Sequence, residues 1–392
     1  MNFIDKKQIL TSFLAEGYQL DESALDFLTS HTDQIVDVLE GLQKLLKKPA
    51  ILTDKHIKTL LNPQTPITLK TPQHVSKPLT PNTILSLLSN RYNFLKSVLQ
   101  NRLELTNLTS INKIGGSKQF SLIALLREVD YVDKNIIAED KTGSIKLFFD
   151  DQSTAQHLVS EETVGLLCMQ EEGRIKIQRV VHPDIPIKRE IIRSKTKTTC
   201  VFFPAQTLNE LRTHPKHYAK YEMWCKDNNS DNTVVFVLGG IPNPDVLGTL
   251  PKQSTKIVLV NETPQGSDDD SELIIMVEPA LVKIGGVTLF LSTGDFLKDY
   301  ITAMKTNAEE ALVNLLKKRH LNPTFNIQQP IYSNDPYLLD IIPDVIVVGS
   351  SGTPQAINYK GVTIVTTGSP ASQPIVWSTD LQTRETIKID FT

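Results

Sequence analysis

The residues that could carry catalysis or hold a metal are few in this sequence, and they are widely spaced. His214 and His217 have the i, i+3 spacing that would place both imidazoles on one face of a helix. Structural zinc takes four ligands, and no further cysteine, histidine or carboxylate has a suitable spacing beside this pair. Three adjacent carboxylates, at 268–270, lie in a polar Gly/Ser loop, and such runs are usually solvated. We therefore expect no metal at either place.

A glycine- and serine-rich run near the carboxyl terminus superficially resembles a phosphate-binding loop. It reads Gly349-Ser350-Ser351-Gly352-Thr353. A P-loop requires Gly-Lys-Ser/Thr at the start of a helix, whereas Pro354 follows here, so the run predicts a turn. Ser292 or Ser350 would need a histidine partner to act as a nucleophile. His320 is the only histidine in the C-terminal third, and its position after basic residues predicts a helix end.

Composition indicates an ordinary globular chain. The 392 residues suffice for two or three domains, and with 40% hydrophobic and 22% charged residues they can form substantial cores. The net charge of −3 means that contact with nucleic acid must be local or supplied by a partner. No run of 18 apolar residues occurs and the amino terminus lacks signal-peptide order, so we expect a cytoplasmic protein without a membrane span.

The cysteines point to the same compartment. Cys168, Cys200 and Cys225 are odd in number and far apart. This pattern excludes a disulfide framework or a Cys-x-x-Cys zinc site within the chain. It predicts buried free thiols, the state that a reducing cytoplasm favours.

The first 82 residues predict a small helical domain followed by a linker. Apolar residues recur at helical spacing in four stretches of 1–61, and Asp21 is placed to cap the second. A unit of this size suits docking to another protein better than catalysis. Residues 62–82 contain five prolines among Thr, Gln and Lys, which predicts a linker with extended, semi-rigid stretches.

Residues 83–187 predict a helix followed by a small β-barrel. Five strand-like runs lie between residues 120 and 181, and Asp140-Lys141-Thr142-Gly143 supplies turn chemistry. This pattern favours the oligonucleotide/oligosaccharide-binding (OB) fold. Single-strand binding would need exposed aromatics interleaved with Arg or Lys. Phe148-Phe149 is a candidate, but the basic interleaving is thin, so packing between domains is the favoured role.

Residues 188–392 predict an α/β domain. Buried strands are expected near 198–203, 234–238, 256–260 and 345–348, with helices between some of them. In such a fold a site forms in the loops that follow the strands. Here those loops carry Ser, Gly, Thr and Pro, and they lack the His, Asp and Asn that metal chemistry needs.

Several motifs of this chain have an order and spacing similar to those of a known protein family. The similarity covers about residues 83–391 and is strongest at the carboxyl terminus. The motifs there are Glu278-Pro279-Ala280-Leu281-Val282 with Gly286-Val287, Asn307-Ala308-Glu309-Glu310-Ala311, Lys318-Arg319-His320-Leu321-Asn322-Pro323, Ile342-Pro343-Asp344-Val345, Tyr359-Lys360-Gly361-Val362 and Thr366-Thr367-Gly368-Ser369. Upstream, Asn90-Arg91-Tyr92, Glu139-Asp140-Lys141-Thr142-Gly143 and His182-Pro183-Asp184-Ile185-Pro186 are also similar. With these motifs the chain resembles the small subunit of the archaeal family-D DNA polymerase, a family akin to the B subunits of eukaryotic replicative polymerases.

This resemblance implies an α+β multidomain fold. Its parts would be an N-terminal small helical domain (1–61), a Pro-rich linker (62–82), a helix with an OB-fold barrel (83–187) and a calcineurin-like phosphoesterase α/β sandwich (188–392). In active archaeal members the last domain is a two-metal 3′–5′ exonuclease. Such chemistry needs carboxylate, imidazole and amide ligands that hold two cations close together.

The sequence departs from that ligand set wherever the resemblance places a ligand. Other residues stand at the places of an Asp-x-His, a Gly-Asp, a His before a glycine and a Gly-His-x-His motif: Pro204 with Gln206, Gly240, Thr293, and Ser350 with Gly352. A Gly-Asn-His-Asp motif falls near 262–265, which reads Glu-Thr-Pro-Gln. Asp245 and Asp295 remain nearby, and two scattered carboxylates bind Mg²⁺ weakly at best. We expect an inactive phosphoesterase domain with no catalytic residue, no metal and no cofactor.

The resulting hypothesis is a non-catalytic accessory (B) subunit of a replicative DNA polymerase. It would scaffold the large catalytic subunit in a heterodimer, touch DNA indirectly through the complex, and reach other replication factors through the N-terminal helical domain. Two alternatives stay open: a metal-dependent 3′–5′ exonuclease with relocated ligands, and a single-strand DNA-binding OB module. The chain would be either its host's only small subunit or a paralogue beside an active one.

Overall fold

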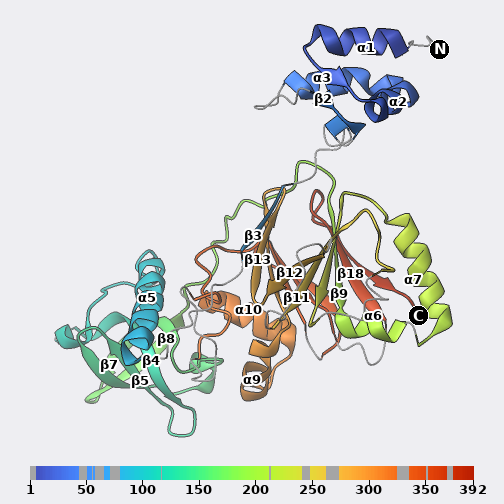
Figure 1. Ribbon diagram of the computed structural model, residues 1–392. Coiled ribbons are helices and arrows are strands. Elements are labelled where there is room, and N and C mark those ends of the chain that lie inside the picture. Colours follow the sequence, from blue (N-terminus) through green and yellow to red (C-terminus); the bar gives the residue numbers. More distant parts are fainter. Residues whose placement is uncertain are drawn as a thin grey trace. The chain divides into compact units, whose positions relative to one another are not determined.

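The architecture is mixed α+β, as the sequence predicts (Figure 1). The computed structural model describes residues 6–43, 51–54, 56–57, 66–70, 80–115, 117–211, 213–240, 248–261, 273–324, 335–349, 352–368 and 374–392. The chain divides into two compact units, Met1–Pro66 and Ile67–Thr392. In the described part of the chain, no helix combines the length and the apolar character needed to cross a bilayer.

The described residues of the first unit form helices around a short parallel strand pair. The elements are α1 (Lys6–Ala15), α2 (Glu22–Ser30), α3 (Ile35–Gln43), β1 (Gln19–Leu20) and β2 (Ile51–Leu52). Asp21 caps α2 as predicted, because its Oδ1 accepts a hydrogen bond from the Ala24 N–H at 2.7 Å. Phe13 and Leu28 lie in the core of this unit. Most of the predicted fourth helix falls outside the described residues.

The second unit begins with a strand inside the stretch that the sequence predicts as a linker. β3 (Ile67–Lys70) pairs antiparallel with β13 (Ala280–Ile284) at the edge of a sheet. Its side chains are mostly exposed, which is usual for a short edge strand. The extended backbone expected of 62–82 therefore becomes part of a sheet at these residues, while the division into domains stays a prediction.

A helix and a closed five-stranded barrel follow, as the strand pattern predicts. α5 (Pro81–Leu99) begins at Thr80, whose Oγ1 accepts from the Thr83 N–H. The strands in barrel order are β4 (Gln119–Asp130), β5 (Asn135–Asp140), β6 (Gly143–Phe148), β8 (Arg174–Val181) and β7 (Thr163–Glu171). The turn between β5 and β6 forms because Asp140 Oδ1 accepts from the Thr142 and Gly143 N–H groups.

Two six-stranded sheets make up the rest of this unit. The first has the order β12 (Leu273–Val277), β11 (Thr255–Val260), β10 (Thr233–Leu238), β9 (Thr199–Pro204), β18 (Ile375–Asp380) and β19 (Thr386–Asp390). The second has the order β16 (Gln355–Tyr359), β17 (Val362–Thr366), β15 (Val345–Val348), β14 (Val287–Ser292), β13 and β3. β9 to β12 are mutually parallel, and so are β14, β15 and β17.

The sheets lie face to face, with helices on their outer surfaces (Figure 1). Alternate residues of β9 show the layering: Cys200 and Phe202 pack against the second sheet, whereas Val201 and Phe203 pack against α6 (Ala205–Leu211) and α7 (Pro215–Asp227). α9 (Asp295–Met304) and α10 (Ala308–Lys318) cover the second sheet. The strands are buried on both faces, which explains why they read as continuous apolar runs.

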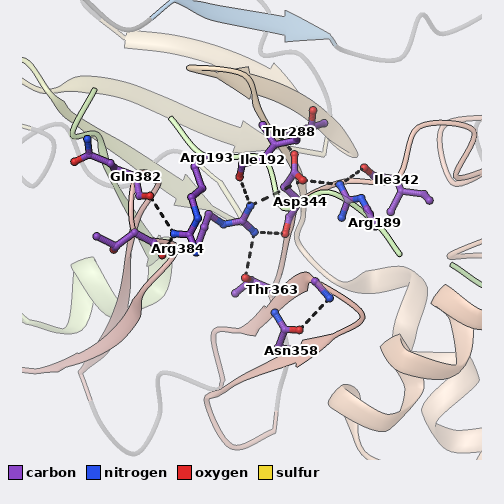
Figure 2. A network of polar contacts seen from close by, with 12 residues as sticks. Arg189, Ile192, Arg193, Thr288, Ile342, Asp344, Asn358, Thr363, Gln382 and Arg384 are labelled. Carbon is purple, nitrogen blue, oxygen red and sulfur yellow. Dashed lines mark hydrogen bonds and ion pairs between the residues drawn. The ribbon is translucent and has the colours of Figure 1, made fainter. Parts of the chain in front are cut away.

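One buried carboxylate fastens the two sheets together at the edge where the parallel strands begin (Figure 2). Asp344 precedes β15, and its Oδ2 accepts from the Thr288 N–H at 2.8 Å. Arg189 donates to Asp344 Oδ1 at 2.5 Å. Arg384, from the turn between β18 and β19, donates to the Asp344 carbonyl oxygen at 2.5 Å and to Thr363 Oγ1 at 3.2 Å. We call the edge where the parallel strands begin the amino edge.

A second buried ion pair joins the barrel to α10. Lys318 Nζ donates to Glu162 Oε2 at 2.5 Å, and both side chains are 2% exposed. Burial raises the pKa of the Glu162 carboxyl and lowers the pKa of the Lys318 ammonium. Each charge therefore depends on the other, and losing one leaves the other buried without its partner.

The Asp344 network yields a stability prediction. Asp344→Asn should lower the free energy of unfolding by about 3–5 kcal/mol, because Arg189 and Arg384 would stay buried beside a neutral amide. Chemical denaturation followed by tryptophan fluorescence measures this. Asp150→Asn is the control: its carboxylate is 76% exposed in its pair with Lys176, so the change should be at most about 1 kcal/mol. Equal effects of the two variants would contradict the assignment.

The buried ion pair between the barrel and α10 yields a second stability prediction. Lys318→Met should destabilise the protein by about 3–5 kcal/mol, because the Glu162 carboxylate loses its counter-charge. Adding Glu162→Gln should recover about 1 kcal/mol or more, since the amide oxygen can still accept from the Val159 N–H and no unpaired charge remains. A double-mutant cycle of unfolding free energies measures the coupling, and strict additivity would refute it.

Candidate functional site

The parallel strands of both sheets end at one common edge, opposite the amino edge. The residues that follow or close these strands are Pro204, Gly240, Asn261, Glu278, Thr293, Gly349 and Thr367. We call this the carboxyl edge. Hydrogen bonds link neighbouring strand ends: Gly240 N–H donates to Leu259 O at 3.1 Å, and Gly349 N–H donates to Ser292 O at 2.9 Å. This is the position where α/β folds build their sites.

Glu278 is the centre of the carboxyl edge. It follows β12 of the first sheet, and its Oε2 accepts from three donors at the end of β14 in the second sheet. These are Ser292 Oγ at 3.0 Å, Thr293 N at 2.5 Å and Thr293 Oγ1 at 2.5 Å. Ser292 Oγ in turn accepts from the Gly294 N–H at 3.1 Å. The hydroxyl of Thr293 is therefore directed at a carboxylate of the protein itself.

The loops after β14 and β15 are in direct backbone contact. A Cβ on Gly294, where φ is +91°, would overlap the Gly349 carbonyl oxygen. A Cβ on Gly349 would overlap the Thr293 carbonyl oxygen. Both positions require glycine for this approach. The resemblance placed a histidine next to each of them, and the structure shows why the glycines matter independently of those histidines.

Where the structure describes them, the positions predicted to have lost ligands lie at the end of a strand of this edge or soon after it. Pro204 closes β9 and is buried, and Gly240 follows β10. Gln206 lies in α6, and its Nε2 donates to Glu210 Oε1 at 2.8 Å. Gly352 is exposed after β15, and a Cβ added to it would meet no atom within 4 Å. Ser350 lies outside the described residues, as do Asp245 and 262–272.

The carboxylates that the structure does describe here do not form a metal site. Asp295 accepts from Lys298 Nζ at 2.6 Å and, more weakly, from Asn261 Nδ2 at 3.4 Å. The Asp295–Lys298 pair is exposed, and Glu278 is held by hydroxyl and amide donors. Among the described residues, no group of three His, Cys, Asp or Glu side chains is placed to hold a metal ion. The residues in view can satisfy one another but cannot assemble a two-metal centre.

The other candidate residues are used elsewhere. His214 and His217 stack at 5.1 Å near the start of α7, with His214 immediately before the helix. His320 is buried: its Nδ1 accepts from the Asn322 N–H and its Nε2 contacts Asp335 Oδ2 at 2.8 Å. Both ring nitrogens are thus occupied, so His320 activates no serine. Cys168, Cys200 and Cys225 are buried free thiols, as predicted, and burial raises the pKa of Cys168 to about 12.

The barrel carries one aromatic side chain between cations. Lys146 Nζ lies 5.8 Å and Arg174 Cζ 5.3 Å from the centre of the half-buried Phe148 ring. Phe149 lies in the barrel core, so the candidate aromatic pair presents only one ring to the outside. Residues 104–187 contain nine Lys or Arg against thirteen Asp or Glu. This charge balance does not favour binding to the phosphate backbone of a nucleic acid.

Two kinds of sequence comparison relate the chain to replication proteins. Residues 188–358 match the family model for the B subunit of DNA polymerase alpha/epsilon. The DNA polymerase II small subunit of Pyrococcus abyssi is 21% identical over 356 residues, covering 74% of this chain and 57% of that protein. The DNA polymerase II small subunit of Pyrococcus furiosus is 21% identical over 388 residues, covering 78% of this chain and 62% of that protein. These matches confirm the predicted resemblance. The chain spans less than two thirds of the length of these relatives.

Solved structures give weaker similarities. An archaeal phosphodiesterase is 12% identical with a TM-score of 0.30, covering 49% of this chain and 99% of that one. Vacuolar protein sorting 29 from Cryptosporidium parvum is 13% identical with a TM-score of 0.29, covering 50% and 96%.

The hydrogen bonds of Glu278 give the prediction for this edge. Glu278→Gln should lower the free energy of unfolding by about 1–3 kcal/mol, because a neutral amide oxygen accepts the hydrogen bonds from Ser292 and Thr293 more weakly than a carboxylate oxygen does. The midpoint of thermal unfolding measures the loss. Asp295→Asn, which alters an exposed pair, is the control and should change the free energy by at most about 1 kcal/mol. An unchanged midpoint for Glu278→Gln would show that its hydrogen bonds do not hold the edge together.

Proposed function

We propose that this chain is a non-catalytic small (B) subunit of a replicative DNA polymerase of the archaeal family-D type. It would stabilise the large catalytic subunit and position it, without a reaction of its own. The relation to DNA polymerase II small subunits supports the assignment to this class of protein. The single observation that carries the catalytic silence is the carboxyl edge, where Glu278 is bound by Ser292 and Thr293.

The fold supports a division of labour between the parts. Two face-to-face sheets with helices outside fit the calcineurin-like phosphoesterase sandwich that the resemblance implies, and the closed five-stranded barrel fits an OB fold. We assign the sandwich and the barrel to binding of the large subunit. The helical unit before residue 66 would reach other replication factors, and DNA would be contacted through the complex.

The two alternatives have less support from the described residues. A nuclease with relocated ligands would need a cluster of carboxylates or imidazoles, and the described carboxyl edge offers Glu278, which is saturated on one oxygen, and the exposed Asp295. A single-strand-binding barrel would need a basic face, and the barrel region is acidic in balance.

Co-expression with the polymerase large subunit tests the assignment. We expect the two chains to purify as one complex with higher polymerase activity and a higher thermal midpoint than the large subunit alone, because a bound partner stabilises the folded state by mass action. The measurement is size-exclusion chromatography followed by primer extension. A large subunit that neither binds this chain nor gains activity from it would refute the proposal.

A nuclease assay of the purified chain tests separately whether it is catalytically inactive. The purified chain, supplied with Mn²⁺ and a 3′-labelled single strand, should release no nucleotide above the level given by a matched preparation of Asp295→Asn. Turnover by the wild type that Asp295→Asn abolishes would instead establish the relocated-ligand nuclease.

A further inference from the structure

The segment between the barrel and β9 is fixed across the amino edge of the second sheet. The side chain of Ile192 packs against the core between the sheets. Ile191 lies against the turn between β16 and β17, where a Cβ on Gly361 would be 3.4 Å from it. Arg189 donates to the carbonyl oxygen of Ile342, just before β15, at 3.0 Å. The backbone path of 189–193 is therefore set before any partner arrives.

This edge has a surplus of positive charge. The side chains of Arg189 and Arg384 converge on the single carboxylate of Asp344, while Arg193 donates to the carbonyl oxygens of Gln382 and Thr383 (Figure 2). Within the described residues, Arg189 Nη1 and Arg384 Nε are buried without a hydrogen-bond acceptor. Residues 187–197 contain five Lys or Arg and one Asp or Glu. The two unpaired guanidinium nitrogens are out of a partner's reach, but the exposed side chains of Lys188 and Arg193 favour an anion at this surface.

Large apolar side chains are exposed beside these cations. Ile187 is 81% exposed, Ile191 is 47% exposed and Ile341 is 46% exposed. Ile341 adjoins the residue whose carbonyl accepts from Arg189, so the isoleucines flank the network rather than lie on a distant face. Lys188 is exposed between two of them, and the exposed carboxylates of the same two segments are Glu190 and Asp340.

We propose that Ile187, Lys188, Ile191, Arg193 and Ile341 form a docking surface for a protein segment that carries both carboxylates and apolar side chains. We call it the amino-edge surface. This inference rests on the proposed function, under which the segment belongs to the catalytic large subunit. Apolar contacts would supply affinity and the cations would select an acidic partner and its orientation.

The chemistry of the surface favours a protein over nucleic acid. A backbone of phosphates is met by Lys, Arg and polar side chains, and it leaves three exposed isoleucines without a matching group. An apolar centre rimmed by charge is the usual composition of a protein–protein interface. Because 189–193 is already held in place by the contacts of Arg189, Ile191 and Ile192, little conformational entropy is lost when this segment binds.

Two exposed substitutions test the surface with the full-length chain and the purified large subunit. Ile187→Glu introduces a charge where an apolar contact is expected, and Lys188→Glu reverses a charge. Each should weaken the dissociation constant by about tenfold or more, measured by biolayer interferometry at fixed ionic strength. Lys188→Glu should also make the affinity less dependent on salt concentration, because one attractive pair is lost.

Matched controls separate the surface from general effects of charge. Val36→Glu changes a 64% exposed apolar residue on α3, and Lys7→Glu reverses an exposed charge on α1, both in the first unit. Both should bind the large subunit like the wild type, and all four variants should keep the wild-type midpoint of thermal unfolding. Loss of affinity confined to Ile187→Glu and Lys188→Glu supports the inference.

The opposite outcomes are distinguishable. If the wild-type chain binds the large subunit and Ile187→Glu and Lys188→Glu bind equally well, the amino-edge surface is wrong while the proposed function stands. If the wild-type chain does not bind the large subunit at all, both fall. If Lys188→Glu weakens binding of a labelled single-stranded or duplex DNA but leaves binding of the large subunit intact, the surface belongs to nucleic acid and the inference is overturned.

Discussion

The second unit depends on one buried charge between its two sheets. Asp344 has a side chain that is 3% exposed, and it connects three parts of the chain that are distant in sequence: the segment after the barrel, the start of β14 and β15, and the turn between β18 and β19. Apolar burial stabilises two sheets against each other but is non-directional. Directional contacts from Arg189 and Arg384 to Asp344 and its carbonyl fix which ends of the sheets meet. The position of the carboxyl edge follows from that alignment.

The two edges of the sandwich differ in how their polar groups are satisfied. At the carboxyl edge, Thr293 and Glu278 pair with each other, while the buried hydroxyl of Thr367 has no hydrogen-bond partner in the described residues. At the amino edge, guanidinium nitrogens remain buried without acceptors, and isoleucines stay exposed. In the described residues, the amino edge thus buries two guanidinium nitrogens without an acceptor, whereas the carboxyl edge buries the hydroxyl of Thr367 without a partner.

Sequence reasoning predicted the elements whose signal is local. β9, β10 and β15 are continuous apolar runs, and the turn at Asp140 has its chemistry within four residues. It could not predict β3, because four largely exposed residues gain their strand geometry from β13, which lies more than two hundred positions later. Glu278 was missed as the centre of the site for a related reason: its sequence position directly after a strand was visible, but its donors 14 and 15 residues away were not. The predicted loss of a ligand at Thr293 rests on the residues that flank it, and it stays a prediction.

The buried polar contacts between the barrel region and the sandwich also bear on scaffolding. Arg91 on α5 pairs with Asp335 at 2.6 Å, and burial of Asp335 is outweighed by His320 and Arg91, which hold the pKa of its carboxyl well below the usual range. Lys318 and Glu162 make a second such contact. Buried ion pairs add little net stability compared with apolar packing, but they penalise every alternative arrangement that leaves a charge unpaired. A barrel and sandwich joined in this way present their surfaces in one fixed relation, and a fixed relation is what a subunit needs if its function is to position a larger partner.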